Sequence, residues 1–343
     1  MGRRLCIITP CFEDIASLLK LTQHLASACG EAKRMSSVAL FIINDSPWQA
    51  LSAKDLMSHI HQFSNWTNLE EINTISLSRN VGHQRGLVIG LSLAYQQFGK
   101  DSDYLLMDCD GEDQPKDVPR LFNSLQQSNS LAVVAAREKR HEGLRFQLGY
   151  HLYKLLFRLL SGKYINFGNF MILSPETARA IIHSPDAQTP LASTLLRSRF
   201  PMLRIGVERG RRYQGTSKMG GMTSLVHLGI KSISTFAEDV ITRLLIGNAV
   251  AMLLVTALMI LLIGNYFLPV LPPIPGWTSV MLVVILGLSL VIALQLLNSI
   301  FLLGVERARE GLDGNQIASL LVVKIEQQKN CHYCEDRQPV SCN

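Results

Sequence analysis

Short apolar runs alternate with longer amphipathic stretches from residue 5 to residue 136. Runs with the length of buried strands lie at 5–9, 38–43, 71–77, 103–108 and 131–136. The stretches with apolar residues at helical spacing begin near Ser17, Ala53, Gly86 and Pro119. Strands that alternate with helices predict a mostly parallel sheet covered on both faces. In such a sheet ligands bind at the carboxyl ends of the strands, which is where the loops of this chain fall.

Two much longer apolar runs follow, at 244–268 and 278–304, and neither contains a charged residue. A bilayer core about 30 Å thick is spanned by roughly 20 apolar residues as helix, so both runs are long enough to cross it. The Pro-rich loop 269–277 is too short for a domain, so the runs predict a transmembrane hairpin. The alternative is a buried pair of core helices, although such helices normally carry some polar residues.

These patterns predict how the chain is divided. The parts are an α/β domain over 1–222, an amphipathic juxtamembrane helix over 223–243, the hairpin over 244–304 and a polar cytoplasmic tail over 305–343. We expect the tail to extend loosely beneath the membrane. Arg243 precedes the hairpin and Arg307 and Arg309 follow it, while its loop is uncharged, so the positive-inside rule places the α/β domain and both chain ends in the cytoplasm. No apolar stretch suited to a signal peptide precedes the first strand.

Net charge is +6, and basic residues concentrate before the first apolar run. They are Arg197, Arg199, Arg204, Arg209, Arg211, Arg212, Lys218, Lys231 and Arg243. Such a cluster suits anionic headgroups and phosphates. Nucleic acid is the weaker explanation, because the sequence has no aromatic-rich basic strand and no recognisable reading helix. An amphipathic segment at 145–160 either packs on the domain or lies along the membrane surface.

Seven cysteines, an odd number in an expected reducing compartment, argue against a disulfide framework. In the tail, Cys331 and Cys334 are spaced as zinc ligands can be, with His332 and Cys342 nearby. A complete zinc site there would need His332 or a second chain as a ligand, and a plain polar tail is the alternative.

The segment MDCDGEDQP places Asp108, Asp110, Glu112 and Asp113 directly after the fourth predicted strand. Mg²⁺ and Mn²⁺ prefer oxygen ligands, and two carboxylates at a strand end can join one cation to a diphosphate. The cation would stabilise a leaving nucleoside diphosphate as charge develops on it. An isolated Asp-x-Asp is also common as a solvated turn, but its position at a strand end favours the metal interpretation.

Several blocks of sequence occur in a fixed order before the two apolar runs. They are IITPCFED (7–14), FIINDS (41–46), LSRNVGHQRG (77–86), MDCDGEDQP (107–115), FGNF (167–170) and RGRRYQGTSKM (209–219). Together they resemble the family 2 glycosyltransferases of GT-A fold. Within that family the chain is most similar to the polyprenyl-phosphate glycosyltransferases, the relatives of dolichyl-phosphate mannose synthase and bactoprenol glucosyltransferase. The resemblance implies a Rossmann-like catalytic domain followed by a two-helix membrane hairpin.

The resemblance also implies roles for individual residues. The implied catalytic residues are Asp108, Asp110, Arg137, Arg209, Arg212 and Lys218. The implied Mg²⁺ or Mn²⁺ ligands are Asp108, Asp110 and Glu112. The nucleotide-sugar site is expected to contain Pro10, Phe12, Asp14, Asn44, Asp45, His83, Glu112, Asn169 and Ser217. For His83, which lies in a strand-end loop with Arg85, a solvated position is the alternative.

The chain departs from the family pattern at four positions. Glu13 stands where Asn is usual, Asn44 where Asp is usual and Glu112 where Gln is common. Asn169 stands where many relatives have an Asp that has been considered a catalytic base. An amide cannot accept a proton at neutral pH, but a lipid phosphate is already an anion and needs no base.

The resemblance therefore implies an inverting, metal-dependent transfer of a hexose from a UDP- or GDP-sugar to undecaprenyl or dolichyl phosphate at the inner membrane. Lys218 and the cation would hold the leaving diphosphate, and Arg209 and Arg212 would hold the acceptor phosphate. The arginines can instead form a collar for anionic lipid. Two other functions stay open: transfer to a different membrane lipid or lipid-linked saccharide, and a non-catalytic membrane scaffold. A homo-oligomer packed through the hairpins is compatible with the resemblance.

Overall fold

The computed structural model describes residues 3–30, 35–63, 66–137, 157–159, 161–214, 231–233, 235–267, 276–307 and 313–330. The chain divides into two compact units. The first unit takes its described residues from Met1–Gly149, Ile165–Thr235 and Gly311–Asn343, and the second from Tyr150–Tyr164 and Phe236–Glu310. Ser217, Lys218, the expected zinc residues Cys331, His332, Cys334 and Cys342, and most of 145–160 lie outside the described residues.

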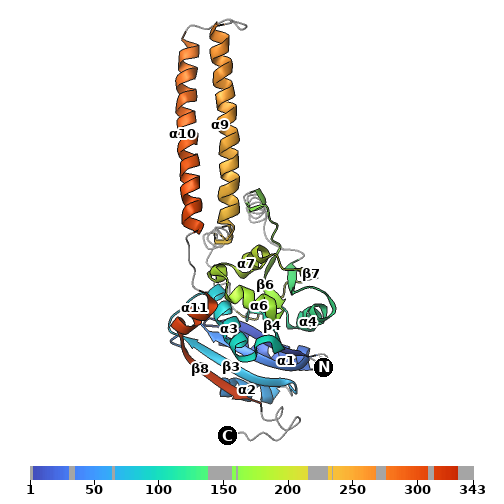
Figure 1. The fold of residues 1–343 in the computed structure, drawn as a ribbon. Coiled ribbons are helices and arrows are strands. Elements are labelled where there is room, and N and C mark those ends of the chain that lie inside the picture. Colours follow the sequence, from blue (N-terminus) through green and yellow to red (C-terminus); the bar gives the residue numbers. More distant parts are fainter. Residues whose placement is uncertain are drawn as a thin grey trace. The chain divides into compact units, whose positions relative to one another are not determined.

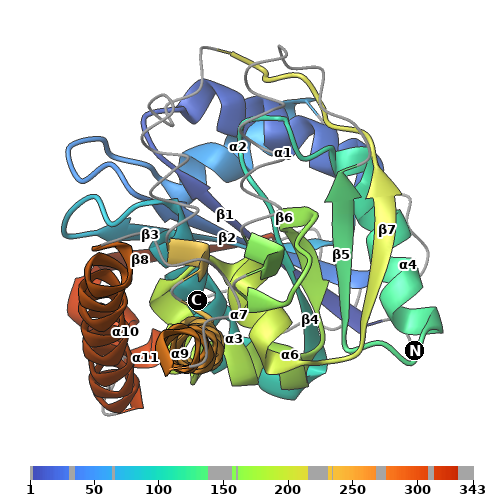
Figure 2. The ribbon, with the colours of Figure 1, turned by 90° about the horizontal axis from the view of Figure 1, so that it is seen from above.

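The described strands of the first unit form one sheet (Figures 1 and 2). They are β1 (Arg3–Cys11), β2 (Met35–Asn44), β3 (Leu69–Leu77), β4 (Ser102–Leu106), β5 (Ala132–Arg137), β6 (Phe167–Leu173), β7 (Met202–Val207) and β8 (Val322–Lys329). Their order is β7-β5-β6-β4-β1-β2-β3-β8. The pairs β1/β2, β1/β4, β2/β3 and β5/β7 are parallel, whereas β6 and β8 run antiparallel to their neighbours. The prediction of a mostly parallel α/β sheet is confirmed.

Helices cover both faces of this sheet (Figure 2). On one face lie α1 (Ile15–Gly30), α2 (Ala53–Phe63) and α4 (Val118–Gln127), and on the other lie α3 (His83–Phe98), α6 (Pro175–Ile182) and α7 (Leu191–Ser198). A hydrophobic core cluster joins the inner faces of α1, α2 and α4 to β1, β2 and β4. Its fully buried members include Leu18, Leu21 and Phe122, and burial of apolar surface of this kind is the main favourable term in folding.

Helix α3 lies unusually close to the centre of the sheet. A Cβ on Gly90 would stand 2.5 Å from Ile8 Cγ2 and 2.8 Å from Ile43 Cδ1, and one on Gly86 would stand 3.2 Å from Pro10 Cβ. A side chain at Gly90 would force Ile8 and Ile43 to move, because real Cβ atoms essentially never come within 3.0 Å of another heavy atom, and one at Gly86 would need a small shift of Pro10. The close contact fixes the first turn of α3 beside the carboxyl ends of β1 and β2.

The segment that follows the hairpin returns to the first unit, which corrects the expectation of a loose tail. Helix α11 (Gly314–Leu321) begins with a capping box formed by Asp313 and Gln316, and His183, which directly follows α6, lies 3.2 Å from Asp313. Strand β8 then pairs along the length of β3. The prediction failed because β8 is an edge strand with many exposed side chains, so its composition is that of a polar tail.

A buried carboxylate connects β8 to the rest of the unit. The side chain of Glu71 on β3 is 2 % exposed. It accepts hydrogen bonds from Asn73 Nδ2 at 2.7 Å, from Gln97 Nε2 of α3 at 2.6 Å and from Gln327 Nε2 of β8 at 2.5 Å. These charge-assisted bonds satisfy a carboxylate that would otherwise be costly to bury.

We expect Glu71→Ala to loosen β8, because the buried Asn73 amide loses its acceptor and Gln327 loses its anchor. A cost of about 2 kcal/mol, the scale for a buried group left unpaired, corresponds to amide hydrogen exchange in β8 about 30-fold faster than in the unmodified chain. The matched control is Lys324→Ala, which removes a surface pair with Glu326 on β8 itself and should change exchange little. Equal exchange in the two variants would contradict this assignment.

Asp103, at the start of β4, gives the first unit a pH-dependent stability. Its carboxylate is 2 % exposed, lies 3.3 Å from Arg3 Nε and accepts a hydrogen bond from Gln126 Nε2 at 2.5 Å. Burial raises the pKa of Asp103 to about 6 even though Arg3 and Gln126 favour the charged form. A raised folded-state pKa makes the contribution of this group to stability largest below its ordinary pKa of 3.8, and that contribution is lost as pH rises through about 6.

Asp103→Asn is therefore expected to stabilise the protein at pH 7.5 relative to the unmodified chain, by at most about 3 kcal/mol for a shift of this size. The amide keeps an acceptor for Gln126 and removes the charge. The difference should shrink as pH falls through about 6 and vanish near pH 4. Thermal unfolding at several pH values measures this, and a variant that is less stable at pH 7.5 by the same amount as at pH 4 would contradict it.

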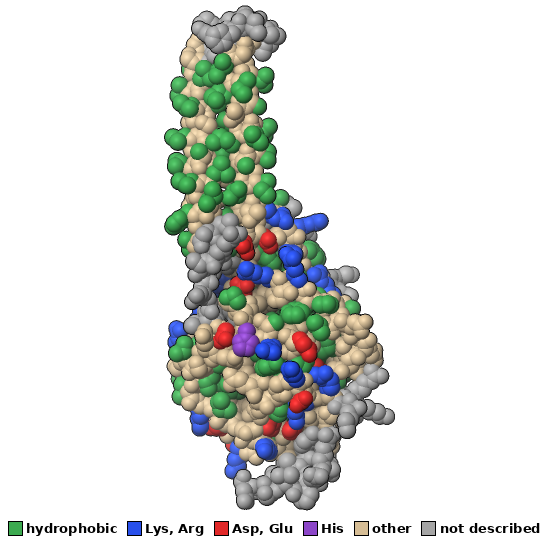
Figure 3. Space-filling view, in the orientation of Figure 1, with side chains coloured by type: hydrophobic (Ala, Val, Ile, Leu, Met, Phe, Trp, Pro, Cys, Tyr) green, Lys and Arg blue, Asp and Glu red, His purple; other side chains and the backbone are tan. Residues whose placement is uncertain are grey.

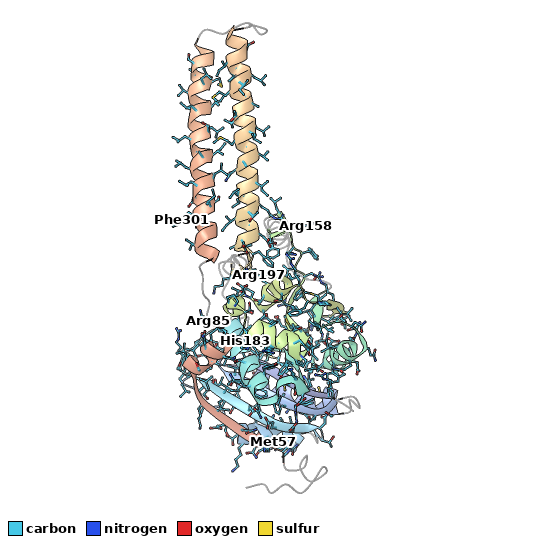
Figure 4. The ribbon with its side chains drawn as sticks, viewed as in Figure 1. Met57, Arg85, Arg158, His183, Arg197 and Phe301 are labelled. Atoms are coloured by element: carbon cyan, nitrogen blue, oxygen red, sulfur yellow. The ribbon has the colours of Figure 1, made fainter. Side chains whose placement is uncertain are left out.

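The second unit is built around two long helices, α9 (Ala237–Phe267) and α10 (Trp277–Arg307), which lie side by side (Figure 1). Their apolar stretches Ala237–Asn265 and Ser279–Leu302 have mean hydropathies of 2.5 and 2.9, and only 0 % and 6 % of these stretches is buried. Hydrophobic side chains such as Phe301 point outward along both helices (Figures 3 and 4). Both helices are long and apolar enough to cross a membrane, and their exposure does not fit a buried core pair.

The expected juxtamembrane helix differs from the structure at its C-terminal end. Residues 237–243 form the first turns of α9 instead of a separate helix, and 223–230 lie outside the described residues. Within the second unit, Phe157 packs edge-on against Phe236 with 5.8 Å between ring centroids. Arg243 donates a hydrogen bond to the Leu159 carbonyl at 3.1 Å, so the end of the predicted amphipathic segment is joined to the start of α9.

Candidate active site

The predicted site residues gather where the parallel strands end. Cys11, the last residue of β1, is paired with Asn44, the last residue of β2, and the Asp45 amide donates to the Cys11 carbonyl at 2.9 Å. The adjacent β4 ends at Leu106, so Asp108 and Asp110 follow at the same edge. This is the edge at which open α/β sheets bind ligands.

The loops after β1 and β2 support each other. The Glu13 amide donates to Ser46 Oγ at 2.8 Å, and the Asn44 side chain donates to the Gln49 carbonyl at 2.6 Å while accepting from the Ser46 amide at 3.1 Å. Phe12 lies edge-on to Trp48 at 6.0 Å between centroids, and Trp48 is 64 % exposed. The pair offers an exposed aromatic surface of the kind on which a nucleobase can stack. Trp48 was not predicted, although its place two residues after FIINDS was a usable signal.

Asp45 holds the loop that leads into α3. It is 2 % exposed, and its two carboxylate oxygens accept hydrogen bonds from the Val81 amide at 2.7 Å and the Gly82 amide at 3.0 Å. Burial raises the pKa of Asp45, and these two bonds work in the opposite direction. The carboxylate of Asp45 therefore stabilises the conformation of the loop that contains Val81 and Gly82.

That loop positions His83, the first residue of α3, against the first acidic residue of the site. Gly82 has φ of 84°, a conformation suited to glycine, and His83 Nε2 then lies 2.8 Å from Asp108 Oδ1. Burial lowers the pKa of His83, but the carboxylates of Asp108, Asp113 and Asp110 outweigh it and raise this pKa above its ordinary value. The nearby Asp108 carboxylate therefore favours the protonated form of His83.

The acidic segment 108–113 forms a tight turn. The Asp108 amide donates to Asp113 Oδ2 at 3.0 Å, and the Glu112 amide donates to Asp110 Oδ1 at 2.9 Å. Gly111, with φ of 91°, makes the turn possible. Burial and the nearby Asp108 raise the pKa of Asp110.

A second segment, 208–213, closes over this turn from the end of β7. The Gly210 amide donates to the Glu112 carbonyl at 2.8 Å, and the Tyr213 amide donates to the Asp110 carbonyl at 2.9 Å. The Tyr213 ring lies against Gly111, where a Cβ would be 2.8 Å away, and its hydroxyl is 2.8 Å from His24 Nδ1. The two segments, about a hundred residues apart in sequence, thus form one structure, which we call the acidic–basic clasp (108–113 with 208–213).

Ion pairs join the two halves of the acidic–basic clasp. Arg209 Nη2 bonds Glu112 Oε2, Arg212 Nε lies 3.2 Å from Glu112 Oε1, and Arg212 Nη2 lies 2.5 Å from Asp110 Oδ2. The predicted meeting of the acidic and the arginine-rich segments is therefore present in the fold. Paired guanidinium groups offset the cost of placing several carboxylates close together.

The expected ligand set of Asp108, Asp110 and Glu112 is not assembled in this arrangement. No three His, Cys, Asp or Glu side chains of the described residues form a group that could hold a metal ion. Each of the three carboxylates instead faces a basic side chain, and an opposite charge nearby favours the ionised form of a carboxylate. Asp108 and Asp110 still offer the hard oxygen donors that Mg²⁺ and Mn²⁺ prefer.

The other predicted residues lie around the same edge. Pro10 is buried in β1, and Asp14 accepts from the Ser17 amide at 3.3 Å in the first turn of α1. Arg137 ends β5 and is paired with Val207, the residue that leads into the clasp. Asn169 lies on β6 two residues from Met171, which pairs with the last residue of β4.

No family model matches the chain, and no curated protein matches it. Among solved structures, the chain is similar to glucosyl-3-phosphoglycerate synthase from Mycobacterium tuberculosis in complex with Mn²⁺, UDP-glucose and phosphoglyceric acid, at 11 % identity and a TM-score of 0.46, covering 69 % of this chain and 80 % of that one. It is also similar to mannosyl-3-phosphoglycerate synthase from Rubrobacter xylanophilus, at 13 % identity and a TM-score of 0.43, covering 68 % and 73 %. Similarity at this level assigns neither a reaction nor a substrate to this chain.

Proposed function

We propose that this protein is a membrane-bound glycosyltransferase that moves a hexose from a nucleotide-sugar to a polyprenyl phosphate, with inversion at the anomeric carbon and dependence on Mg²⁺ or Mn²⁺. The observation that carries the proposal is the acidic–basic clasp at the carboxyl edge of the sheet, where Asp110 and Glu112 meet Arg209 and Arg212. A reaction in which a phosphate displaces a diphosphate needs both kinds of charge at one place.

The donor half of the site fits a nucleotide-sugar. The exposed Phe12–Trp48 pair supplies an aromatic surface for the base, next to the strand ends. Asp108 and Asp110 would hold the cation, which supplies positive charge to the diphosphate as it leaves. Lys218, from the predicted basic block, would add a second positive charge to the same leaving group.

The acceptor half fits a phosphate. A guanidinium binds phosphate oxygens in pairs, so Arg209 and Arg212 would orient an acceptor phosphate beside the donor. A phosphate oxygen forms the new bond to the anomeric carbon while the bond from that carbon to the diphosphate oxygen breaks. The acceptor is already an anion, so an amide at Asn169 does not obstruct the reaction, whereas a neutral lipid hydroxyl would need a base.

The second unit supports a lipid acceptor. Two helices long and apolar enough to span a bilayer belong to the same chain as the proposed site. With the basic residues before α9, the positive-inside rule favours a cytoplasmic catalytic unit at the inner membrane. A polyprenyl phosphate presents its anionic group at that surface, where the substrate and the enzyme would be confined together.

The test is an assay of the purified chain in detergent with Mn²⁺, undecaprenyl or dolichyl phosphate, and a panel of UDP- and GDP-sugars. The proposal predicts a lipid product heavier by one hexose with one of the donors, and release of nucleoside diphosphate only when lipid phosphate is present. Transfer to a free lipid alcohol or to diacylglycerol, with none to lipid phosphate, would favour a different membrane acceptor. Absence of nucleotide-sugar binding would favour a scaffold.

A further inference from the structure

Both the backbone and the side chain of Glu112 make contacts within the acidic–basic clasp. Its amide donates to Asp110 Oδ1 at 2.9 Å, and its carbonyl accepts from Gly210 at 2.8 Å. Its Oε2 bonds Arg209 Nη2, and its Oε1 lies 3.2 Å from Arg212 Nε. Both carboxylate oxygens therefore point at guanidinium groups.

The identity of the residue at this position matters for these contacts. A carboxylate has two equivalent acceptor oxygens, so it can pair with two guanidinium groups at once. A glutamine, the common residue here in the family that the chain resembles, has one acceptor oxygen and a donor NH₂ group. The NH₂ group would face one of the arginine donors without forming a bond, so only one arginine would be held.

From this arrangement we infer that Glu112 is a positioning residue for Arg209 and Arg212 and is not a ligand of the cation. It keeps the two guanidinium groups beside the Asp108–Asp110 turn, where an acceptor phosphate would approach. This inference rests on the proposed function for the identity of the acceptor. The inference leaves Asp108 and Asp110 as the ligands of the cation. It also explains why a glutamate replaces the common glutamine at position 112, because its negative charge pairs with the two arginines beside it.

Arg209 and Arg212 differ in their acidic partners. Arg209 is paired with Glu112, whereas Arg212 spans Glu112 and Asp110. Asp110 Oδ2 lies 2.5 Å from Arg212 Nη2, so a cation held by Asp110 would compete with Arg212 for this carboxylate. Arg212 would then turn toward the phosphates while its Nε contact with Glu112 keeps it in place.

The experiment compares Glu112→Gln with the unmodified full-length chain. We expect the KM for polyprenyl phosphate to rise at least about 10-fold, as for loss of a charge-assisted contact, with kcat changed less than about 3-fold. The affinity for Mn²⁺ in the presence of UDP, measured by electron paramagnetic resonance of free Mn²⁺, should stay within about 3-fold. Amide hydrogen exchange at Gly210 and Tyr213 should become at least about 10-fold faster.

Matched variants decide between the two roles of Glu112. Asp110→Asn should weaken Mn²⁺ binding more than about 10-fold, and Glu112→Ala should not. Arg209→Gln should raise the KM for the acceptor as Glu112→Gln does. The variant with both substitutions should have a KM close to that of either single variant, because the two residues act as one unit. A loss of Mn²⁺ affinity in Glu112→Ala equal to that in Asp110→Asn would overturn the inference, as would unchanged exchange at Gly210 and Tyr213.

The Mn²⁺ and hydrogen-exchange measurements need no acceptor. If the unmodified chain transfers no sugar to lipid phosphate, the proposed function fails, while these two measurements still decide whether Glu112 holds the arginines. Thermal unfolding of each variant separates the local effect from a loss of fold, since an intact variant melts close to the unmodified chain.

Discussion

Asp110→Ala is expected to lower kcat by roughly 10³-fold, the scale found when one electrostatic stabiliser of a transition state is removed. Asp110 is 9 % exposed and lies between the Glu112 amide at 2.9 Å and Arg212 Nη2 at 2.5 Å. Its loss removes a proposed cation ligand and leaves Arg212 without one of its two acidic partners. The measurement is the rate of lipid-linked sugar formation at saturating donor and Mn²⁺.

Two further variants show whether the charge itself is responsible. Asp110→Asn keeps an acceptor for the Glu112 amide, so it should preserve the turn while losing nearly as much activity as the alanine variant. Asp101→Ala removes an exposed carboxylate just before β4, at the opposite end of that strand from the site, and should change kcat less than about 2-fold, as for a surface substitution away from the chemistry. Full activity in Asp110→Ala would contradict a role for this carboxylate in sugar transfer.

The sequence predicted the central strands and their helices because both depend on local periodicity. A helix was predicted to begin near Ala53, and the structure begins α2 at that residue. Strand β8 could not be found in this way, because it pairs with β3 across more than two hundred residues and exposes most of its side chains. The Glu71 contacts that attach it depend on amides from three separate elements, and no local pattern encodes them.

For the site, the sequence predicted which residues come together but not how they pair. From the order of the sequence blocks, Asp110 and Arg212 were expected in the same site, and in the structure they are in contact. The pairing of each carboxylate was not predictable, because it depends on backbone turns such as that at Gly111. Glu112 was therefore expected to face a cation, whereas in the structure it faces two arginines.

The second large effect is expected at Gly210, which no sequence pattern singled out. A Cβ there would stand 2.2 Å from the Gly111 carbonyl oxygen and 2.9 Å from Gln114 Cγ. The nearer obstacle is backbone, so it cannot rotate away as the end of a flexible side chain can. Gly210→Ala must therefore push segment 208–213 off the acidic turn and break the bond from the Gly210 amide to the Glu112 carbonyl.

We expect Gly210→Ala to reduce kcat/KM by about 10²-fold, the size of effect that a displacement near 1 Å produces in a positioned active site. The proposed cation ligands Asp108 and Asp110 are unchanged in this variant, so Mn²⁺ affinity should fall far less than transfer does. Gly30→Ala is the matched control, because its Cβ would lie 3.9 Å from Trp66 Cδ1 in ordinary contact. If Gly210→Ala transfers sugar as fast as Gly30→Ala, then the acidic–basic clasp contributes nothing to the reaction, and Arg209 and Arg212 must act from another conformation.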